Sequence, residues 1–136
     1  MSLTRSELRV KIMIILYQIF LYGEKIEYNI GDVIKENLEI DNEFVKEVVH
    51  GVLEHKEEIT TVANKYLSNW TIDRLGLTDQ AILCIGIYEL LYTDTPGIVV
   101  INESVELAKE YSDDKVVKMI NAVLDEVYHN EESYES

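Results

Sequence analysis

The sequence is poor in the residues that stabilise small folds without a core or that interrupt regular structure. Its 136 residues contain one cysteine, one proline and six glycines. The single cysteine, Cys84, allows no internal disulfide and no cysteine-rich metal site, and a lone thiol fits a reducing cytosol. We therefore expect a cytoplasmic protein. So few chain-breaking residues favour helices over a turn-rich β fold.

Basic residues are also scarce, with 12 Lys and Arg against 26 Asp and Glu and a net charge of −14. Binding nucleic acid through the overall field needs clustered Lys and Arg, so this charge disfavours that mode and also binding to an anionic membrane. The apolar run 12–16 is interrupted by Tyr17 and Gln18. It is shorter than the roughly 20 residues that span a bilayer, and no signal-peptide cleavage site follows it.

The length fits one domain with its own core, and 47% hydrophobic residues are too many for a disordered chain. The apolar spacing predicts an all-α, single-domain bundle of about seven helices in residues 1–129, and an acidic, frayed tail in 130–136. The fifth helix is apolar nearly all round and should be the buried central one. The first expected helices are 4–22, closed by Gly23, then 32–38, and then a third that is capped by Asp41 or Asn42. A fourth over 59–67 could continue the third, and a fifth runs from Thr78 and Asp79 to Tyr92. A sixth follows the turn 94–97 and has Ile101, Val105 and Ala108 on one face, and a seventh starts at Asp113 and Asp114.

Motifs for catalysis are missing. His50 and His55 are five residues apart, whereas two metal ligands on one helical face need a spacing of three or four. There is no P-loop, no glycine-rich dinucleotide turn and no G-x-S-x-G. Glu89 in the apolar helix could be a catalytic carboxylate, but a salt-bridged or edge-exposed glutamate is favoured. The sequence thus predicts no enzyme, no catalytic residue, no metal and no cofactor, and it indicates a binding module.

Five segments carry a resemblance to a known family, and together they cover nearly the whole chain outside residues 23–41. In this order and at this spacing they resemble the NusB family of bacterial transcription antitermination factors. The segments are 5–11 leading into Leu16-Tyr17-Gln18, then Tyr66-Leu67 with 69–75 and 79–83, then 87–90, then 100–109, and finally 118–125.

The resemblance implies an all-helical fold of about seven helices and a function without catalysis or cofactor. Family members bind the boxA element of ribosomal RNA leaders jointly with NusE, a protein of the small ribosomal subunit, and the complex helps RNA polymerase to read through terminators. We therefore expect NusE, boxA RNA and the RNA polymerase antitermination complex as partners, and no membrane. Some relatives dimerise, so a homodimer stays open. Two alternatives stay open: an acidic protein–protein adaptor with little RNA affinity, and a role linked to RNA cytosine methyltransferases, which carry NusB-like domains.

By the same resemblance, Arg5, Arg9 and Lys11 correspond to basic residues that contact RNA phosphates, and Tyr17 to a residue near both RNA and partner. Residues 1–22 hold these three cations and one acid, Glu7, a net charge of +2 in a chain of net −14. The sequence therefore predicts a small basic end for RNA, helped by a basic partner.

The resemblance assigns four more positions. Lys118 and Met119 correspond to a Lys-Phe pair near RNA, although a methionine cannot stack as a ring does. Asp79 and Asp114 correspond to acidic positions at the partner surface, and both also suit the first turn of a helix. The remaining prominent polar and aromatic residues are interpreted as structural: Asn102, Glu103 and Asn121 as hydrogen-bonding residues that fix the packing, and Trp70 as a core or core-edge anchor.

Overall fold

The computed structural model describes residues 2–132, and those residues form helices joined by short connections with no strand among them. The all-α prediction is confirmed. Of the predicted tail, Asn130 belongs to the last helix and 133–136 lie outside the described residues. The elements are α1 (Arg5–Tyr22), α2 (Ile30–Asn37), α3 (Glu43–Glu54), α4 (Lys56–Tyr66), the 3-10 turn η1 (Ile72–Arg74), α5 (Leu77–Tyr92), α6 (Gly97–Tyr111) and α7 (Asp114–Asn130).

Short polar side chains fix the helix ends. Thr4 and Glu7 form a capping box, in which the Thr4 hydroxyl accepts from the Glu7 amide at 3.1 Å and the Thr4 amide donates to the Glu7 carboxylate at 2.9 Å. Gly23, at φ 54°, ends α1 in a conformation that favours glycine. Asn42, one of the two predicted candidates, caps α3, and Asp113 caps α7.

Several helix starts differ from the sequence prediction. The third and fourth helices are separate, one of the two possibilities left open, with a turn at His55, whose ring stacks on Tyr92 with centroids 4.0 Å apart. Helix α4 begins at Lys56 rather than at residue 59, and α5 begins at Leu77 after Gly76, so Thr78 lies inside the helix and does not cap it. Helix α2 begins at Ile30, two residues before the predicted start, because the side chain of Asn29 caps it by accepting from the Asp32 amide.

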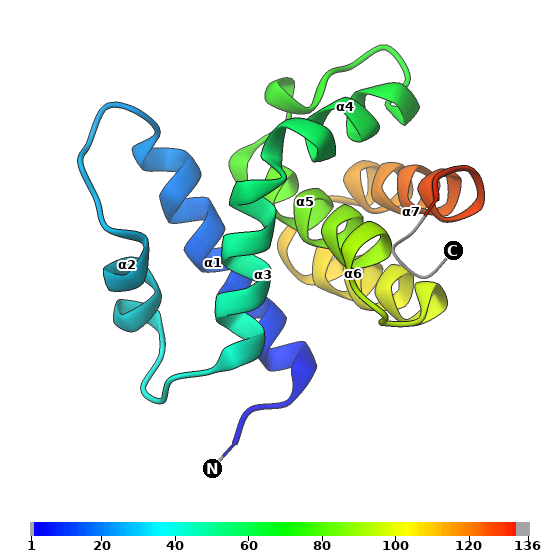
Figure 1. Cartoon of the computed structure of the whole chain (residues 1–136). Coiled ribbons are helices and arrows are strands. Elements are labelled where there is room, and N and C mark those ends of the chain that lie inside the picture. The colour runs from blue at the N-terminus through cyan, green and yellow to red at the C-terminus, as the bar shows by residue number, and fades with distance from the viewer. Residues whose placement is uncertain (1, 133–136) are drawn as a thin grey trace.

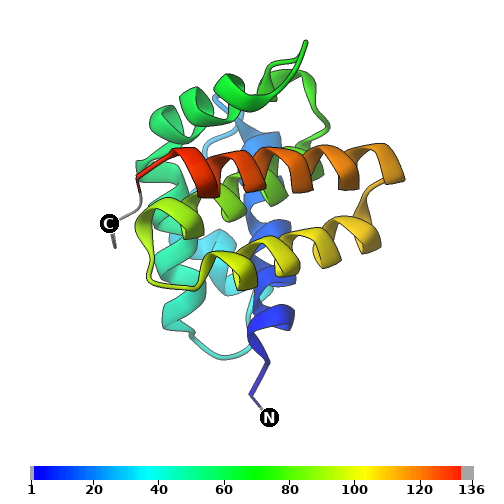
Figure 2. The same ribbon diagram turned by 90° about the vertical axis from the view of Figure 1, so that its right-hand side faces the viewer.

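Helix α5 is the centre of the fold, as its composition predicted. Every residue from Ala81 to Leu91 is buried, and α1, α3, α4, α6 and α7 all pack against this helix. Figures 1 and 2 show α1 and α3 on one side of α5 and the pair α6–α7 on the other. No helix among residues 2–132 is long and apolar enough to cross a membrane.

The contact of α5 with α6 and α7 depends on one glycine. A Cβ atom on Gly86 would lie 2.8 Å from a methyl of Leu124 and 3.0 Å from the Ser104 hydroxyl, so a side chain there would force the helices apart. Ser104 is buried in this contact. The predicted α6 stripe is right at Ala108, which is buried, and wrong at Ile101 and Val105, which are only half-buried. The other buried residues of α6 are Val100, Ser104 and Leu107.

Candidate RNA and partner interface

The predicted phosphate ligand Arg9 is buried, with 5% of its surface exposed. Its guanidinium donates to both carboxylate oxygens of Glu89 on α5, at 2.8 Å through Nε and 2.7 Å through Nη2. Burial alone would lower the pKa of Arg9, but the bonds to Glu89 and its charge outweigh burial and raise that pKa. The salt-bridged interpretation of Glu89 is confirmed. A phosphate contact by Arg9 does not fit this geometry, because it would leave Glu89 buried and unpaired.

Arg5 is exposed but is held in place by α3. Its guanidinium carbon lies 3.9 Å from the centroid of the Phe44 ring, and the same atom of Arg9 lies 5.3 Å from it. The two arginines thus share one helical face, as their spacing indicates. Arg5 also lines a cleft of about 480 Å³ together with the carboxylates of Glu43, Glu47 and Asp94.

In three dimensions one cation of the predicted basic end, Arg9, is ion-paired, and acidic residues of other segments lie beside Arg5. The charge of +2 counted along residues 1–22 takes no account of α3 and α5, whose acids the fold brings beside α1. Glu103 of α6 is a further acidic residue beside α1, because its carboxylate accepts a hydrogen bond from Ser6 at 2.8 Å. Lys11 lies apart from Arg5 and lines a different groove, between α1 and the α2–α3 connection. No continuous cationic patch forms from Arg5, Arg9 and Lys11.

The remaining predicted RNA residues lie on α1 and α7. Tyr17 is 39% exposed, enough for one face of its ring to take a stacked base. Lys118 is exposed and makes no ion pair among residues 2–132, so its ammonium is free to meet a phosphate. Met119 is half-buried and packs against the core, which gives its side chain a structural role in addition to any surface contact.

The two predicted partner residues lie at one corner of the molecule. Asp79, in the first turn of α5, accepts a hydrogen bond of 2.5 Å from the Ser112 hydroxyl in the α6–α7 turn. Asp114 follows two residues after Ser112, exposed in the first turn of α7, next to the capping residue Asp113. The fold therefore joins Asp79 and Asp114, 35 positions apart in the sequence, into a single acidic corner.

Three residues interpreted as structural lie at the surface. Trp70 is 53% exposed in the α4–α5 connection, next to Asn69 with φ 66°, and it is not among the residues packed against the core, so its interpretation as a core or core-edge anchor was wrong. Asn102 and Asn121 are exposed and make no side-chain hydrogen bond within residues 2–132. Asn102 lies two positions from each of the buried residues Val100 and Ser104, and this helical spacing directs its side chain away from the core. The spacing could have indicated a surface position from the sequence.

Reactive groups are few in the described part of the chain. Cys84 is fully buried, and burial raises the pKa of its thiol to about 12, so it stays protonated. Within residues 2–132 no group of three His, Cys, Asp or Glu side chains is arranged to hold a metal ion. What this geometry offers is an exposed tyrosine, a few separated cations and an acidic corner.

Sequence and structure comparisons identify relatives over the whole helical region. The model of the NusB family matches residues 6–129. The transcription antitermination protein NusB of Ligilactobacillus salivarius is 42% identical over 130 residues, which cover 91% of this chain and 97% of that protein. Among solved structures, T. maritima NusB matches with a TM-score of 0.87 and 26% identity, over 99% of this chain and 96% of that one.

A second solved structure contains partners. A chain in the crystal structure of the antitermination factors NusB and NusE in complex with dsRNA matches with a TM-score of 0.77 and 34% identity, over 92% of this chain and 96% of that one. The family match spans α1 to α7, and the seven α-helices within residues 2–132 agree with it. The chain therefore belongs to the NusB family of transcription antitermination proteins.

Proposed function

We propose that this chain binds the boxA element of ribosomal RNA leader transcripts jointly with NusE, and that it acts in this way within the RNA polymerase antitermination complex. The observation that carries the proposal is the 34% identity, over 92% of this chain, with a chain from a complex of NusB, NusE and dsRNA. In this function the chain supplies a binding surface and catalyses no reaction.

The charges of the described residues favour joint binding over binding by this chain alone. Arg9 is paired with Glu89 and serves to position α1, which leaves Arg5, Lys11 and Lys118 as separated cations. Each phosphate contact contributes about −0.7 to the log–log salt dependence for single-stranded nucleic acid. Three contacts give a slope of only about −2, so the isolated chain should bind RNA weakly.

The acidic corner formed by Asp79 and Asp114 supports a basic protein partner. Complementary charge speeds the encounter of two proteins and disfavours wrong partners. A ribosomal protein with a basic surface would bring the positive charge that this chain lacks. In the proposed complex Tyr17 stacks on an unpaired base at the boundary between the RNA and this partner, since it is exposed on α1.

The test is a titration of labelled boxA RNA with this chain alone, with the cognate NusE alone, and with both, at two salt concentrations. We expect weak binding by the chain, and at least tenfold tighter binding by the pair than by NusE alone. A boxA sequence with scrambled order serves as the RNA control. If the pair binds boxA no better than NusE alone, the proposal of joint RNA binding is wrong.

The second candidate function is an acidic adaptor that binds NusE without useful RNA affinity. The observations that favour it are the ion pair of Arg9 with Glu89 and the acidic residues that line the cleft beside Arg5, namely Glu43, Glu47 and Asp94. The same titration separates the two functions. The adaptor predicts that this chain binds NusE, measured by calorimetry, while the RNA affinity of NusE does not change.

A further inference from the structure

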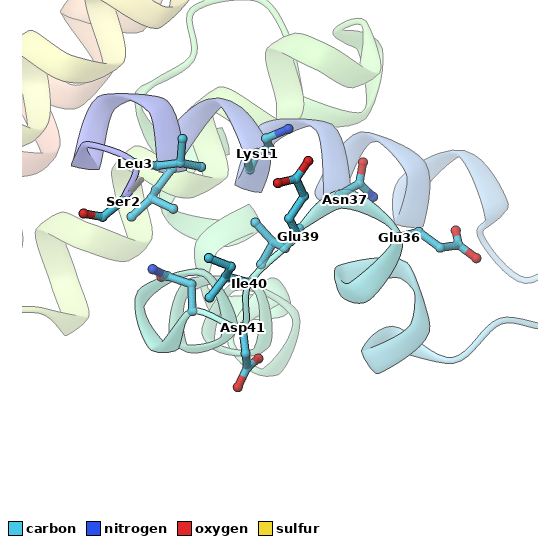
Figure 3. Close-up of a pocket in the computed structure, with 11 residues that line it drawn as sticks. Ser2, Leu3, Lys11, Glu36, Asn37, Glu39, Ile40 and Asp41 are labelled. Atoms are coloured by element: carbon cyan, nitrogen blue, oxygen red, sulfur yellow. The ribbon is translucent and has the colours of Figure 1, made fainter.

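A groove at the N-terminal end of α1 is distinct from the acidic corner and from the cleft at Arg5. It has a volume of about 660 Å³ and lies between α1 and the connection from α2 to α3. In Figure 3, Leu3 and Ile40 lie on facing walls of this space, with Lys11 and Glu39 beside them. A volume of this size falls in the range of pockets that hold a ligand or an anchoring side chain.

The floor and walls of the groove are aliphatic. Leu8 is buried, Leu38 is half-buried, and Leu3 and Ile40 lie at the opening. Ile40 is 70% exposed, the largest exposed fraction among the large hydrophobic residues of the described chain. No aromatic ring lines the groove, so it offers nothing on which a nucleobase would stack.

The rim of the groove is acidic. Three carboxylates line it, those of Glu36, Glu39 and Asp41, against one ammonium, that of Lys11. Asp41 is paired with Lys46 at 2.9 Å, whereas Glu36 and Glu39 make no ion pair within residues 2–132. RNA phosphates would meet net negative charge here, and a basic peptide would meet complementary charge.

Hydrogen bonds hold the α2–α3 connection at both ends. The amide of Asn37 donates to Gln18 of α1 at 2.9 Å and to the Val33 carbonyl at 2.8 Å. At the other end Asn42 caps α3 by accepting from the Val45 amide at 3.0 Å. A ligand would therefore enter a groove that already has its shape, with little ordering cost.

We propose that this groove binds a basic segment of a protein partner, with an aliphatic side chain packed on Ile40 and Leu38 and Lys or Arg side chains paired with Glu36 and Glu39. The site lies at the beginning of α1, whereas the acidic corner lies at the beginnings of α5 and α7. It is a second protein-binding surface, and it does not depend on the proposed RNA function.

The test uses three fluorescent eight-residue peptides with the full chain: alternating Arg and Leu, alternating Arg and Ser, and alternating Glu and Leu. Binding is followed by anisotropy, and the site by amide chemical shifts. We expect saturable binding of the Arg–Leu peptide, with shifts confined to residues 2–3, 8–11 and 36–42. The other two peptides should bind at least tenfold more weakly, because each lacks one half of the recognition chemistry.

Two variants locate the site, each with a matched control. Ile40→Asp should weaken Arg–Leu binding roughly tenfold, whereas Ile98→Asp, at an isoleucine on α6 that is 65% exposed, should leave it unchanged. Glu36→Lys/Glu39→Lys should weaken it at least as much, and Glu57→Lys/Glu58→Lys on α4 should not, although the change in net charge is identical.

Several results would overturn the proposal. One is that the Arg–Leu peptide shows no saturable binding, and another is that the Ile40→Asp variant binds it as tightly as the parent. A third is that NusE displaces the peptide, which would show that the groove is part of the proposed NusE surface. A single-stranded RNA that loses affinity on Ile40→Asp would instead assign the groove to nucleic acid. A dimer in sedimentation that Ile40→Asp dissociates would assign it to a second copy of the chain.

Discussion

The acidic residues at the two ends of α5 have opposite surroundings. At the C-terminal end, Glu89 is buried and its charge is compensated by an ion pair with Arg9 of α1. At its N-terminal end, Asp79 receives only a neutral hydroxyl from Ser112, and Asp114 nearby is exposed. The first end uses its ions to hold helices together, and the second leaves Asp79 and Asp114 without an ion pair within residues 2–132. Charge in a sequence therefore becomes a binding surface only where the fold leaves it unpaired.

The largest effect should come from breaking the buried pair. Arg9→Ala leaves the Glu89 carboxylate buried without a partner and should cost about 3–5 kcal/mol in the free energy of unfolding, measured in urea. The control is Lys118→Ala, an exposed residue without an ion pair, which should change stability by less than about 0.5 kcal/mol. A stable Arg9→Ala variant would show that the pair does not hold α1 to α5.

A second variant separates the pair's geometry from its charge. Arg9→Met/Glu89→Leu replaces both ions with apolar side chains, and such replacements of buried pairs are often neutral or stabilising. We expect most of the stability lost in Arg9→Ala to return. If the double variant is as unstable as Arg9→Ala, the stability comes from the attraction within the ion pair itself, and the cost of leaving Glu89 unpaired does not explain the loss.

At the other end, Asp79→Lys should weaken NusE binding at least tenfold in calorimetry, because it places a cation in the acidic corner. Asp79→Asn keeps an acceptor for Ser112 while it removes the charge, and it should have a smaller effect. Glu57→Lys on α4 is the control for net charge. Unchanged NusE affinity in Asp79→Lys would remove Asp79 from the proposed partner surface.

The exposed cation on α7 should have a smaller effect. Lys118→Ala should weaken RNA binding by the NusE pair severalfold and reduce the magnitude of the salt slope by about 0.7, the value of one phosphate contact. Lys25→Ala, in the α1–α2 connection, is the matched control. An unaltered salt slope in Lys118→Ala would mean that α7 does not touch RNA phosphates.

The smallest effect concerns pH at the capping box. Hydrogen bonds from the backbone and side chain of Thr4 lower the pKa of Glu7 below its ordinary value of 4.5. A lowered pKa in the folded state means stability that is present above the ordinary value and is lost as pH falls through the folded value. Glu7→Gln should therefore flatten the dependence of the melting temperature on pH below about 4.5 and leave it parallel to the parent above.

Local features of the fold were predictable from the sequence, and long-range pairings were not. Caps such as Asn42 and the buried character of α5 follow from residues close together in the chain. A salt-bridged Glu89 was one of the two structural interpretations, but its partner Arg9 is 80 positions away and was assigned to RNA. Trp70 was placed in the core because tryptophan is usually anchored there, and its exposure depends on a loop conformation with no sequence pattern of its own.

The site could be predicted only as a set of residues, not as a surface. Family resemblance indicated Tyr17, Lys118 and Asp79, whose assignments stay predictions, and the fold shows that they are exposed or half-buried. The sum of charges along residues 1–22 suggested a basic end, which stays a prediction, but the sum could not show that α5 pairs Arg9 with Glu89 or that acids of α3 lie beside Arg5. The aliphatic groove at Ile40 had no sequence signal, since it is formed by segments that are separated along the chain.

The most direct test of the account is the RNA affinity of Arg9→Met/Glu89→Leu measured with NusE, after circular dichroism has shown the variant to be folded. If Arg9 only positions α1, the affinity for boxA should stay within about twofold of the parent, while Arg5→Ala in the same assay should lose severalfold. A tenfold loss in the folded double variant would contradict the account, because it would show that Arg9 leaves Glu89 to bind RNA.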